Sequence, residues 1–189
     1  MEKKFDIDCT ALGIVGATSP TNPTGRQFGI NDPALSPHGH MVIPGCGKAL
    51  IMNTTTGAVT PILQVGGGNE TWYNSGDGRY YVTGVDITTG TNSLGVIDAA
   101  TSTWKQSVPA LQATNPTAFA ETNTIFAVVQ LNAGQVTTPS TDISACASAG
   151  GVAGRGCILV FRHVASPSAG LNAMPQIVPA GGGFVEDDD

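Results

Sequence analysis

Five residues of this chain combine ligand chemistry with regular placement: Asn31, Asp32, Asn69, Glu70 and Asn115. Carboxylate and amide oxygens are the ligands that hard cations such as Ca²⁺ prefer. If the five side chains converge, they form a candidate ligand site, with Asp32 and Glu70 as the metal ligands and Ca²⁺ as the only cofactor indicated. The alternative is that these short polar side chains cap turns through hydrogen bonds to the backbone, which needs no ligand.

Histidines and nucleophile motifs add little to that site. His38 and His40 flank Gly39, and a His-x-His pair within a strand would place both rings on one face. A turn at Gly39 breaks this geometry, so a surface turn is favoured. The chain contains no Gly-x-Ser-x-Gly elbow and no His-Glu-x-x-His motif. The motifs therefore leave open whether the protein is an enzyme.

Aromatic side chains offer a second kind of chemistry, stacking on a carbohydrate. Alternation along a strand predicts that only one of two adjacent tyrosines points inward. Packing between sheets explains most of these aromatics without a ligand. The residues in question are Trp72, Tyr73, Tyr80, Tyr81 and Trp104.

The four cysteines contain no Cys-x-x-Cys pair, which disfavours a zinc site. Cys146 and Cys157 flank a segment rich in Gly, Ala and Ser, and a bridge there would tie down a long loop. We predict a Cys146–Cys157 disulfide in an oxidising compartment. The distance between Cys9 and Cys46 depends on packing, so their pairing is left open.

Composition limits the partners. The net charge is −6 with only 8 Lys and Arg, which do not cluster, so neither nucleic acid nor anionic lipid is an expected partner. No apolar run approaches the roughly 20 residues of a membrane span. The N-terminus has no uninterrupted apolar segment of the signal-peptide type, which leaves two alternatives, a cytoplasmic protein or a mature or truncated piece of an exported one. Because exported chains oxidise their cysteines, an extracellular or periplasmic location is expected for a mature or truncated chain.

Internal repeats provide the elements that would position these residues. Three similar units begin at the asparagines 31, 69 and 115, which are 38 and 46 residues apart. This period is typical of a four-stranded blade, with short apolar strands alternating with Gly-, Asp- and Asn-rich turns. The predicted organisation is the outer strands of a preceding blade at 1–20, blades at 31–66 and 69–112, a blade with a long inserted loop at 115–180, and a disordered acidic tail at 181–189.

The middle unit resembles the YVTN/NHL-type β-propellers, a group that includes lactonase-like proteins. The likeness lies in Gly-Asp-Gly-Arg-Tyr-Tyr-Val-Thr-Gly at 76–84 and Leu-Gly-Val-Ile-Asp-Ala-Ala-Thr-Ser-Thr-Trp at 94–104. The Glu-x-Trp-Tyr-Asn-x-Gly-Asp block at 70–77 is similar to one in bacterial exported propellers of unassigned function. The resemblance implies an all-β fold of about three four-stranded antiparallel blades plus a half blade. Closed propellers need about 4–8 blades, so the ring is expected to be incomplete.

Two functions follow as hypotheses. The first is a non-catalytic exported scaffold that binds a protein or glycan through loops such as 131–156. The second is a lactonase-like hydrolase with a divalent cation at the channel mouth, held by Asp32 and Glu70. An incomplete ring also leaves strand edges and apolar faces open, which predicts self-association.

Overall fold

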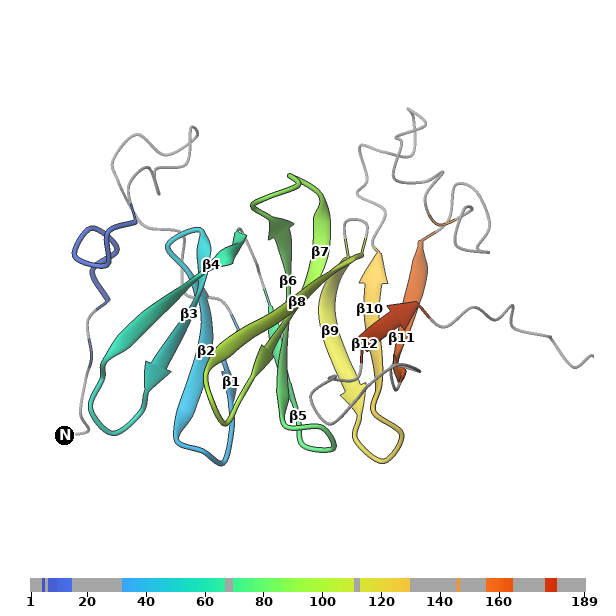
Figure 1. Ribbon diagram of the computed structural model, residues 1–189, viewed down its shortest axis with the longest axis horizontal. Helices are drawn as coiled ribbons and strands as arrows, with labels where there is room; N and C mark the ends of the chain where they lie inside the picture. The colour runs from blue at the N-terminus through green and yellow to red at the C-terminus, as the bar shows by residue number, and fades with distance from the viewer. Residues whose placement is uncertain are drawn as a thin grey trace, which may run out of the picture.

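The computed structural model describes residue 5 and residues 7–14, 32–66, 70–110, 113–129, 146, 156–164 and 176–179. All twelve of its elements are strands (Figure 1). They pair antiparallel in sheets that do not close into a ring. The expected all-β class is confirmed, and the antiparallel sheets of the described residues do not close on themselves.

The first sheet follows the order of the chain. Its two central strands pair from His40 with Asn53 to Gly45 with Lys48, so two apolar runs lie side by side. A turn at residues 37–39, with Gly39 at a φ of 74°, leads into the second strand as the Pro-His-Gly sequence predicts. The strands are β1 (Ala34–Leu35), β2 (His40–Gly45), β3 (Lys48–Asn53) and β4 (Val59–Gly66).

The second sheet repeats this order. The Gly-Asp-Gly sequence lies in the turn at residues 75–78, where Gly78 has a φ of 66°. Two residue pairs, Val65 with Asp86 and Gly66 with Val85, join β4 to β6 and make the first and second sheets one continuous ladder. The strands are β5 (Thr71–Asn74), β6 (Arg79–Asp86), β7 (Asn92–Asp98) and β8 (Thr103–Pro109).

The third sheet is separate, with the strands again in chain order. The predicted Cys146–Cys157 disulfide is present and attaches residue 146 to the start of β11. The tail at 181–189 and most of the loop between β10 and β11 lie outside the described residues. The strands are β9 (Ala113–Phe119), β10 (Thr124–Val129), β11 (Cys157–Val164) and β12 (Gln176–Pro179).

The apolar core is divided into layers between successive sheets. One cluster contains Val42 and Ile51 of the first sheet with Tyr80 and Ile97 of the second. Another contains Leu94 and Val96 of the second sheet with Ile125 and Phe161 of the third. The other buried members of this cluster are Tyr81, Val108, Ala110, Ala113, Ala127, Val129 and Cys146. The sheets therefore stack face to face, and burial between their faces stabilises the stack.

The middle sheet corrects the expectation for its two tyrosines. Tyr80 and Tyr81 point to opposite faces, as alternation requires, yet both are fully buried. Tyr80 packs toward the first sheet and Tyr81 toward the third. A sheet covered on both faces has two inward directions, so the prediction that only one tyrosine is buried was wrong.

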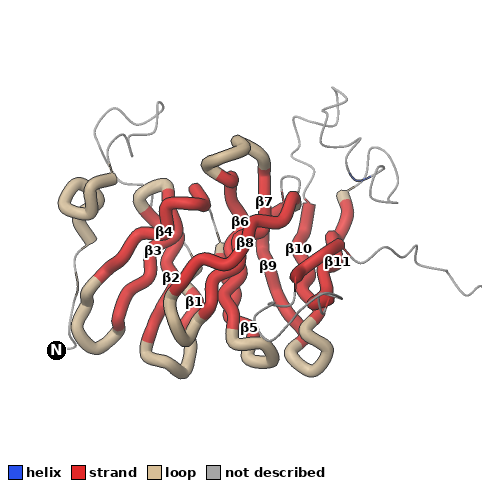
Figure 2. Tube along the Cα trace, viewed as in Figure 1, coloured by secondary structure: helices blue, strands red, loops and turns tan. Residues whose placement is uncertain are grey.

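The N-terminal segment also differs from expectation. In the described part of 1–20, residues 9–13 form a turn rather than strands of a blade. The backbone N–H groups of Leu12 and Ile14 donate to the carbonyls of Asp8 and Cys9. The segment lies beside the first sheet, on the side away from the second (Figure 2). A Cys9–Cys46 disulfide, which the sequence left open, attaches it there.

No helix in the described part of the chain has the length and apolar character that crossing a membrane requires.

Candidate functional site

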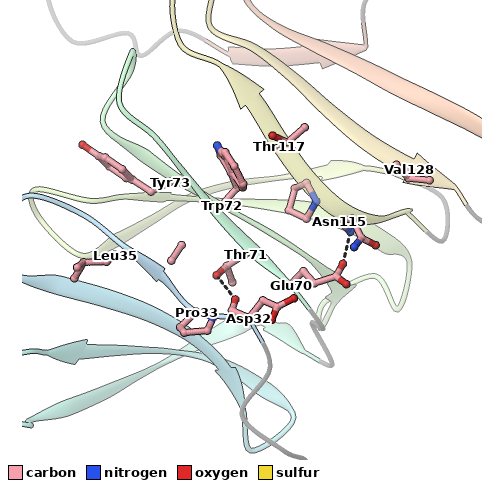
Figure 3. A pocket seen from close by; sticks show the side chains of 12 residues that line it. Asp32, Pro33, Leu35, Glu70, Thr71, Trp72, Tyr73, Asn115, Thr117 and Val128 are labelled. Carbon is pink, nitrogen blue, oxygen red and sulfur yellow. Dashed lines mark hydrogen bonds between the residues drawn. The ribbon is translucent and has the colours of Figure 1, made fainter.

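A hollow of about 690 Å³ opens across the beginnings of β1, β5 and β9, the first strand of each sheet. Figure 3 shows its walls, which come from three units of the repeat. Its lining residues are Asp32, Pro33, Ala34, Leu35, Glu70, Thr71, Trp72, Tyr73, Asn115, Pro116, Thr117 and Val128.

Polar contacts connect the three units at the floor of the hollow. Asp32 and Glu70 form an isolated parallel β-bridge between the first and second sheets. The Thr71 hydroxyl donates a hydrogen bond of 2.8 Å to the Asp32 carbonyl. On the other side, a Glu70 carboxylate oxygen accepts a hydrogen bond from the backbone N–H of Asn115 (Figure 3). These contacts hold the first strands of the three sheets, β1, β5 and β9, at a fixed spacing.

Three of the five predicted site residues therefore come together: Asp32, Glu70 and Asn115. The other two, Asn31 and Asn69, lie outside the described residues. Glu70 makes the kind of backbone hydrogen bond that the turn-capping alternative predicted, although it joins two sheets rather than capping its own turn. Among the residues that the structure describes, no three His, Cys, Asp or Glu side chains are grouped so as to hold a metal ion.

The aromatic wall of the hollow is Trp72 with Tyr73. The Trp72 side chain is 42% exposed, which is unusual for so large an apolar group. Glu70 and Trp72 are two residues apart on one extended segment, so they face the same side. Tyr73 is half-buried and packs on Tyr80, with ring centroids 5.4 Å apart, so its ring is held in place. Of the predicted stacking aromatics, these two reach the hollow.

Leu35 and two prolines complete the wall, and they were not among the site residues predicted from the sequence. Leu35 is 59% exposed on β1, in the position that Tyr73 occupies 38 residues later on β5. Pro33 follows Asp32, and Pro116 follows Asn115. The signal available in the sequence was their adjacency to the anchor residues of each unit, because the first strand of every unit meets the others at one edge.

The electrostatic character of the hollow is acidic. Among the described residues that line it are the carboxylates of Asp32 and Glu70 and no Lys, Arg or His. Asp32 is exposed and Glu70 is partly exposed. A neutral or positively charged group is therefore electrostatically compatible with the hollow, and an anion is repelled.

The histidines lie elsewhere. His38 is exposed in the turn before β2, in agreement with the surface-turn prediction. His40 begins β2, and its carbonyl accepts a hydrogen bond from the Tyr80 hydroxyl. Neither residue lines the hollow.

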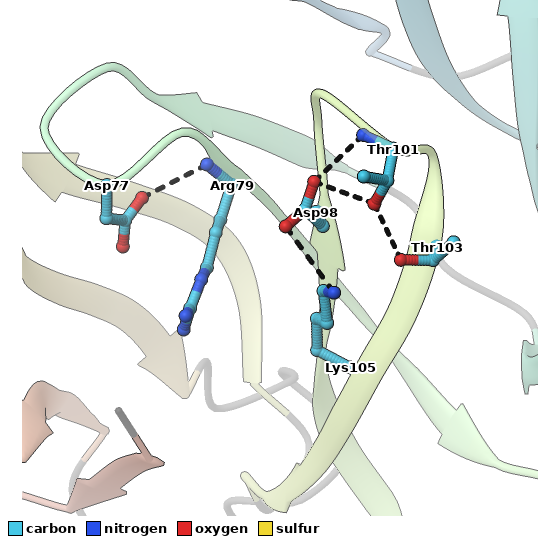
Figure 4. Close-up of polar contacts among 6 residues, drawn as sticks. All are labelled: Asp77, Arg79, Asp98, Thr101, Thr103 and Lys105. Carbon is cyan, nitrogen blue, oxygen red and sulfur yellow. Dashed lines mark hydrogen bonds and ion pairs between the residues drawn. The ribbon is translucent and has the colours of Figure 1, made fainter. Parts of the chain in front are cut away.

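A buried polar cluster lies between the lower turns of the second and third sheets. The Tyr81 hydroxyl donates to the Asp77 carboxylate, which also accepts from the backbone N–H of Arg79 (Figure 4). Burial, followed by the negative charge of Asp77, raises the pKa of the Tyr81 hydroxyl. The Asn74 amide donates to the Asn123 side chain across the two sheets, at 3.2 Å. This cluster joins sheets and lines no part of the hollow.

Comparison with known proteins assigns no family: no protein-family model matches the chain, and no curated protein sequence matches it significantly.

Proposed function

We propose that this chain is a non-catalytic, exported scaffold of YVTN/NHL-type propeller blades that binds a protein or glycan partner. The sequence hypothesis placed the partner on the loops, whereas we now assign it to the hollow across β1, β5 and β9. The observation that carries this proposal is the exposed Trp72 ring in a hollow bounded by two carboxylates.

The chemistry of the hollow matches a ligand with an apolar face and polar edges. An exposed indole stacks on the C–H face of a sugar ring or on an aliphatic or cationic side chain. Carboxylate oxygens on Asp32 and Glu70 accept hydrogen bonds from hydroxyl or ammonium groups at the edge of such a ligand. Trp72 lies on β5, and Asp32 and Glu70 come just before β1 and β5, where they pair with each other. Because these residues are already held in place, binding costs little further loss of conformational freedom.

The structural contacts of Glu70 support a scaffold. Its carboxylate accepts from the Asn115 backbone and so holds the second and third sheets together at the hollow. A carboxylate used in this way organises the binding surface.

Tryptophan fluorescence offers a direct test. The chain has two tryptophans, and Trp104 packs against the core away from the hollow, so a Trp104→Phe variant reports on Trp72 alone. Arrays of neutral oligosaccharides and basic peptides are screened for binding, and each ligand that binds is titrated into this variant. We expect Trp72 emission to change on binding. We also expect Trp72→Ala to bind the ligand at least about tenfold more weakly, equivalent to about 1.4 kcal/mol or more of binding free energy.

Leu63→Ala is the matched control, because Leu63 is a 58% exposed apolar residue on β4, outside the hollow. We expect this variant to bind as tightly as the unaltered chain. Equal binding by Trp72→Ala and the unaltered chain would remove the hollow as the ligand site.

Two carboxylates on one hollow also connect the site to the second hypothesis, a hydrolase with a divalent cation. Calorimetric titration with Ca²⁺ distinguishes the two. Saturable Ca²⁺ binding that is lost in both Asp32→Asn and Glu70→Gln would favour the hydrolase. Under the scaffold proposal, partner binding is unchanged by a chelator.

A further inference from the structure

The stack is built from two kinds of sheet face. We call the face toward the preceding sheet the leading face and the opposite one the trailing face. Both sheet-to-sheet layers join a trailing face to a leading face. The leading faces carry Ile43, Leu50 and Met52 in the first sheet, Tyr80, Val82 and Ile97 in the second, and Ile125, Ala127 and Phe161 in the third.

The leading face of the first sheet is covered by the N-terminal segment. Four apolar side chains of this segment pack on Ile43, Leu50 and Met52, which are each less than a tenth exposed. The disulfide from Cys9 to Cys46 attaches the segment at the turn between β2 and β3. We name this segment, residue 5 with residues 7–14, the cap. Its contact residues are Phe5, Ile7, Leu12 and Ile14.

The trailing face of the third sheet carries a partly open apolar patch, beside Thr124 and Arg162. Phe126 pairs with Val160, and Val128 pairs with Ile158, so four apolar side chains share this face. Ile158 is 57% exposed, and the other three are partly exposed. Leu94 and Val96, which hold the same kind of position on the second sheet, are fully buried by the third.

We propose that the cap occupies the place of a preceding sheet, and that a chain whose cap is released associates head to tail with a second copy. In this association the trailing face of one copy's third sheet packs on the uncovered leading face of the other copy's first sheet.

A second copy is the partner because its first sheet has a leading face, and a leading face is what covers each trailing face inside the chain. Each internal layer pairs a trailing with a leading face, and the proposed contact repeats that pairing between copies. The contact is heterologous, so it leaves one free face at each end and permits longer chains. While the Cys9–Cys46 disulfide holds the cap, the leading face of the first sheet stays covered and cannot join this contact.

The first experiment releases the cap and leaves the other disulfide intact. Sedimentation velocity over a concentration series compares the unaltered chain with Cys9→Ser/Cys46→Ser. Because the cap covers the leading face, we expect the unaltered chain to sediment as one copy, in contrast to the self-association predicted from the sequence. The variant is expected to shift to two or more copies as concentration rises. Cys146→Ser/Cys157→Ser is the matched control, because it removes a disulfide and leaves the cap attached; we expect it to remain single.

The second experiment tests the face. Ile158→Asp, added to the variant with the released cap, buries an unpaired charge in the proposed contact. We expect association to weaken about tenfold or more. Ile87→Asp places the same charge on a 50% exposed residue that follows β6, outside both faces of the proposed contact, and is expected to leave association unchanged.

Circular dichroism checks that each variant is folded. A further variant keeps both disulfides and so tests the cap without the loss of a covalent bond. Leu12→Asp loosens the cap through its apolar contacts alone, and we expect it to associate more strongly than the unaltered chain. The proposal is overturned if folded variants with a loosened cap remain single. Equal association by both cysteine double variants, or association insensitive to Ile158→Asp, also overturns it.

Discussion

The two seams between successive sheets are built differently. At the first seam, between the first and second sheets, the backbones of β4 and β6 pair directly. The Ile87 backbone N–H also donates to the Gln64 carbonyl, at 3.0 Å. The Tyr80 hydroxyl donates to the backbone carbonyl of His40. At each of these contacts the acceptor is a main-chain carbonyl, which any residue supplies.

The second seam, between the second and third sheets, has side chains at its polar contacts. Asn74 bonds to Asn123, and the Glu70 carboxylate accepts from the Asn115 N–H. Asn115 and Asn123 both adopt positive φ values, 48° and 50°, which asparagine tolerates better than most residues. The second seam therefore depends on residue identity more than the first does, since substitution removes a partner that the backbone cannot replace.

Gly76→Ala gives the largest expected effect and attacks the second seam. A Cβ at Gly76 would overlap the Ala120 carbonyl oxygen and the Asn123 side-chain oxygen of the third sheet. Because a backbone atom has to move, we expect a loss of about 3 kcal/mol in the free energy of unfolding. Urea unfolding measures the loss.

The matched control for Gly76 is Gly45→Ala in the first sheet. A Cβ there would meet Leu50 Cδ1 at an ordinary contact distance of 3.5 Å. We expect a change within about 1 kcal/mol. Comparable losses in the two variants would contradict the close approach of the second and third sheets.

Two tyrosines that are adjacent in β6 compare a hydrogen bond across the first seam, from Tyr80 to His40, with one inside the second sheet, from Tyr81 to Asp77. Tyr81→Phe removes a hydroxyl that donates to the Asp77 carboxylate, and we expect a loss of about 2 kcal/mol because the acceptor is charged. Tyr80→Phe removes a bond to a carbonyl, for which about 1 kcal/mol is expected. Both side chains are fully buried, so burial does not confound the pair. If Tyr80→Phe proves the more costly in urea unfolding, the greater strength of the bond to the charged acceptor is contradicted.

The smallest expected effect concerns acid and Asp98, which pairs in register with Arg79 at the lower end of the second sheet. Burial alone would raise the pKa of Asp98, but the Thr101 N–H and hydroxyl and the Lys105 ammonium outweigh it and hold the pKa below 3.8 (Figure 4). A lowered folded-state pKa stabilises the fold above the unfolded-state value. This stabilisation is lost as pH falls through the folded-state pKa.

Asp98→Asn is the corresponding variant, and Asn53 of the first sheet shows that a neutral amide supports a similar turn: its side-chain oxygen accepts from the N–H groups of Thr55 and Thr56. We expect the variant to lose less than about 1 kcal/mol at neutral pH, because solvent screens the charges. The difference from the unaltered chain should shrink below pH 3.8. Unfolding in urea at neutral and acid pH measures it, and a difference independent of pH would contradict the role of the charge.

Much of the local structure was predictable because it depends on short-range chemistry. The turns at 37–39, 75–78 and 120–123 form where Gly, Asp and Asn allow them. The Cys146–Cys157 pair, only 11 residues apart, was inferred from the flexible composition between the two cysteines. The anchor residues Asp32, Glu70 and Asn115 were found by their position in the repeat.

Other features depend on distances that no local pattern encodes. The Cys9–Cys46 pair joins residues 37 apart, and the turn that brings them together was expected to be strands. The exposure of Trp72 and Leu35 beside two fully buried tyrosines could not be read from alternation, because alternation does not show which faces are covered.

The amino-acid sequence by itself determined the all-β class, the three repeating units and their turns, since the apolar period and turn chemistry act within a few residues. Only the tertiary structure decided which faces were covered, that the N-terminal segment became a cap, and that inner strands from three units met in one acidic hollow with an exposed indole. The physical reason is that these features arise from packing between sheets, where side chains from different units of the repeat meet.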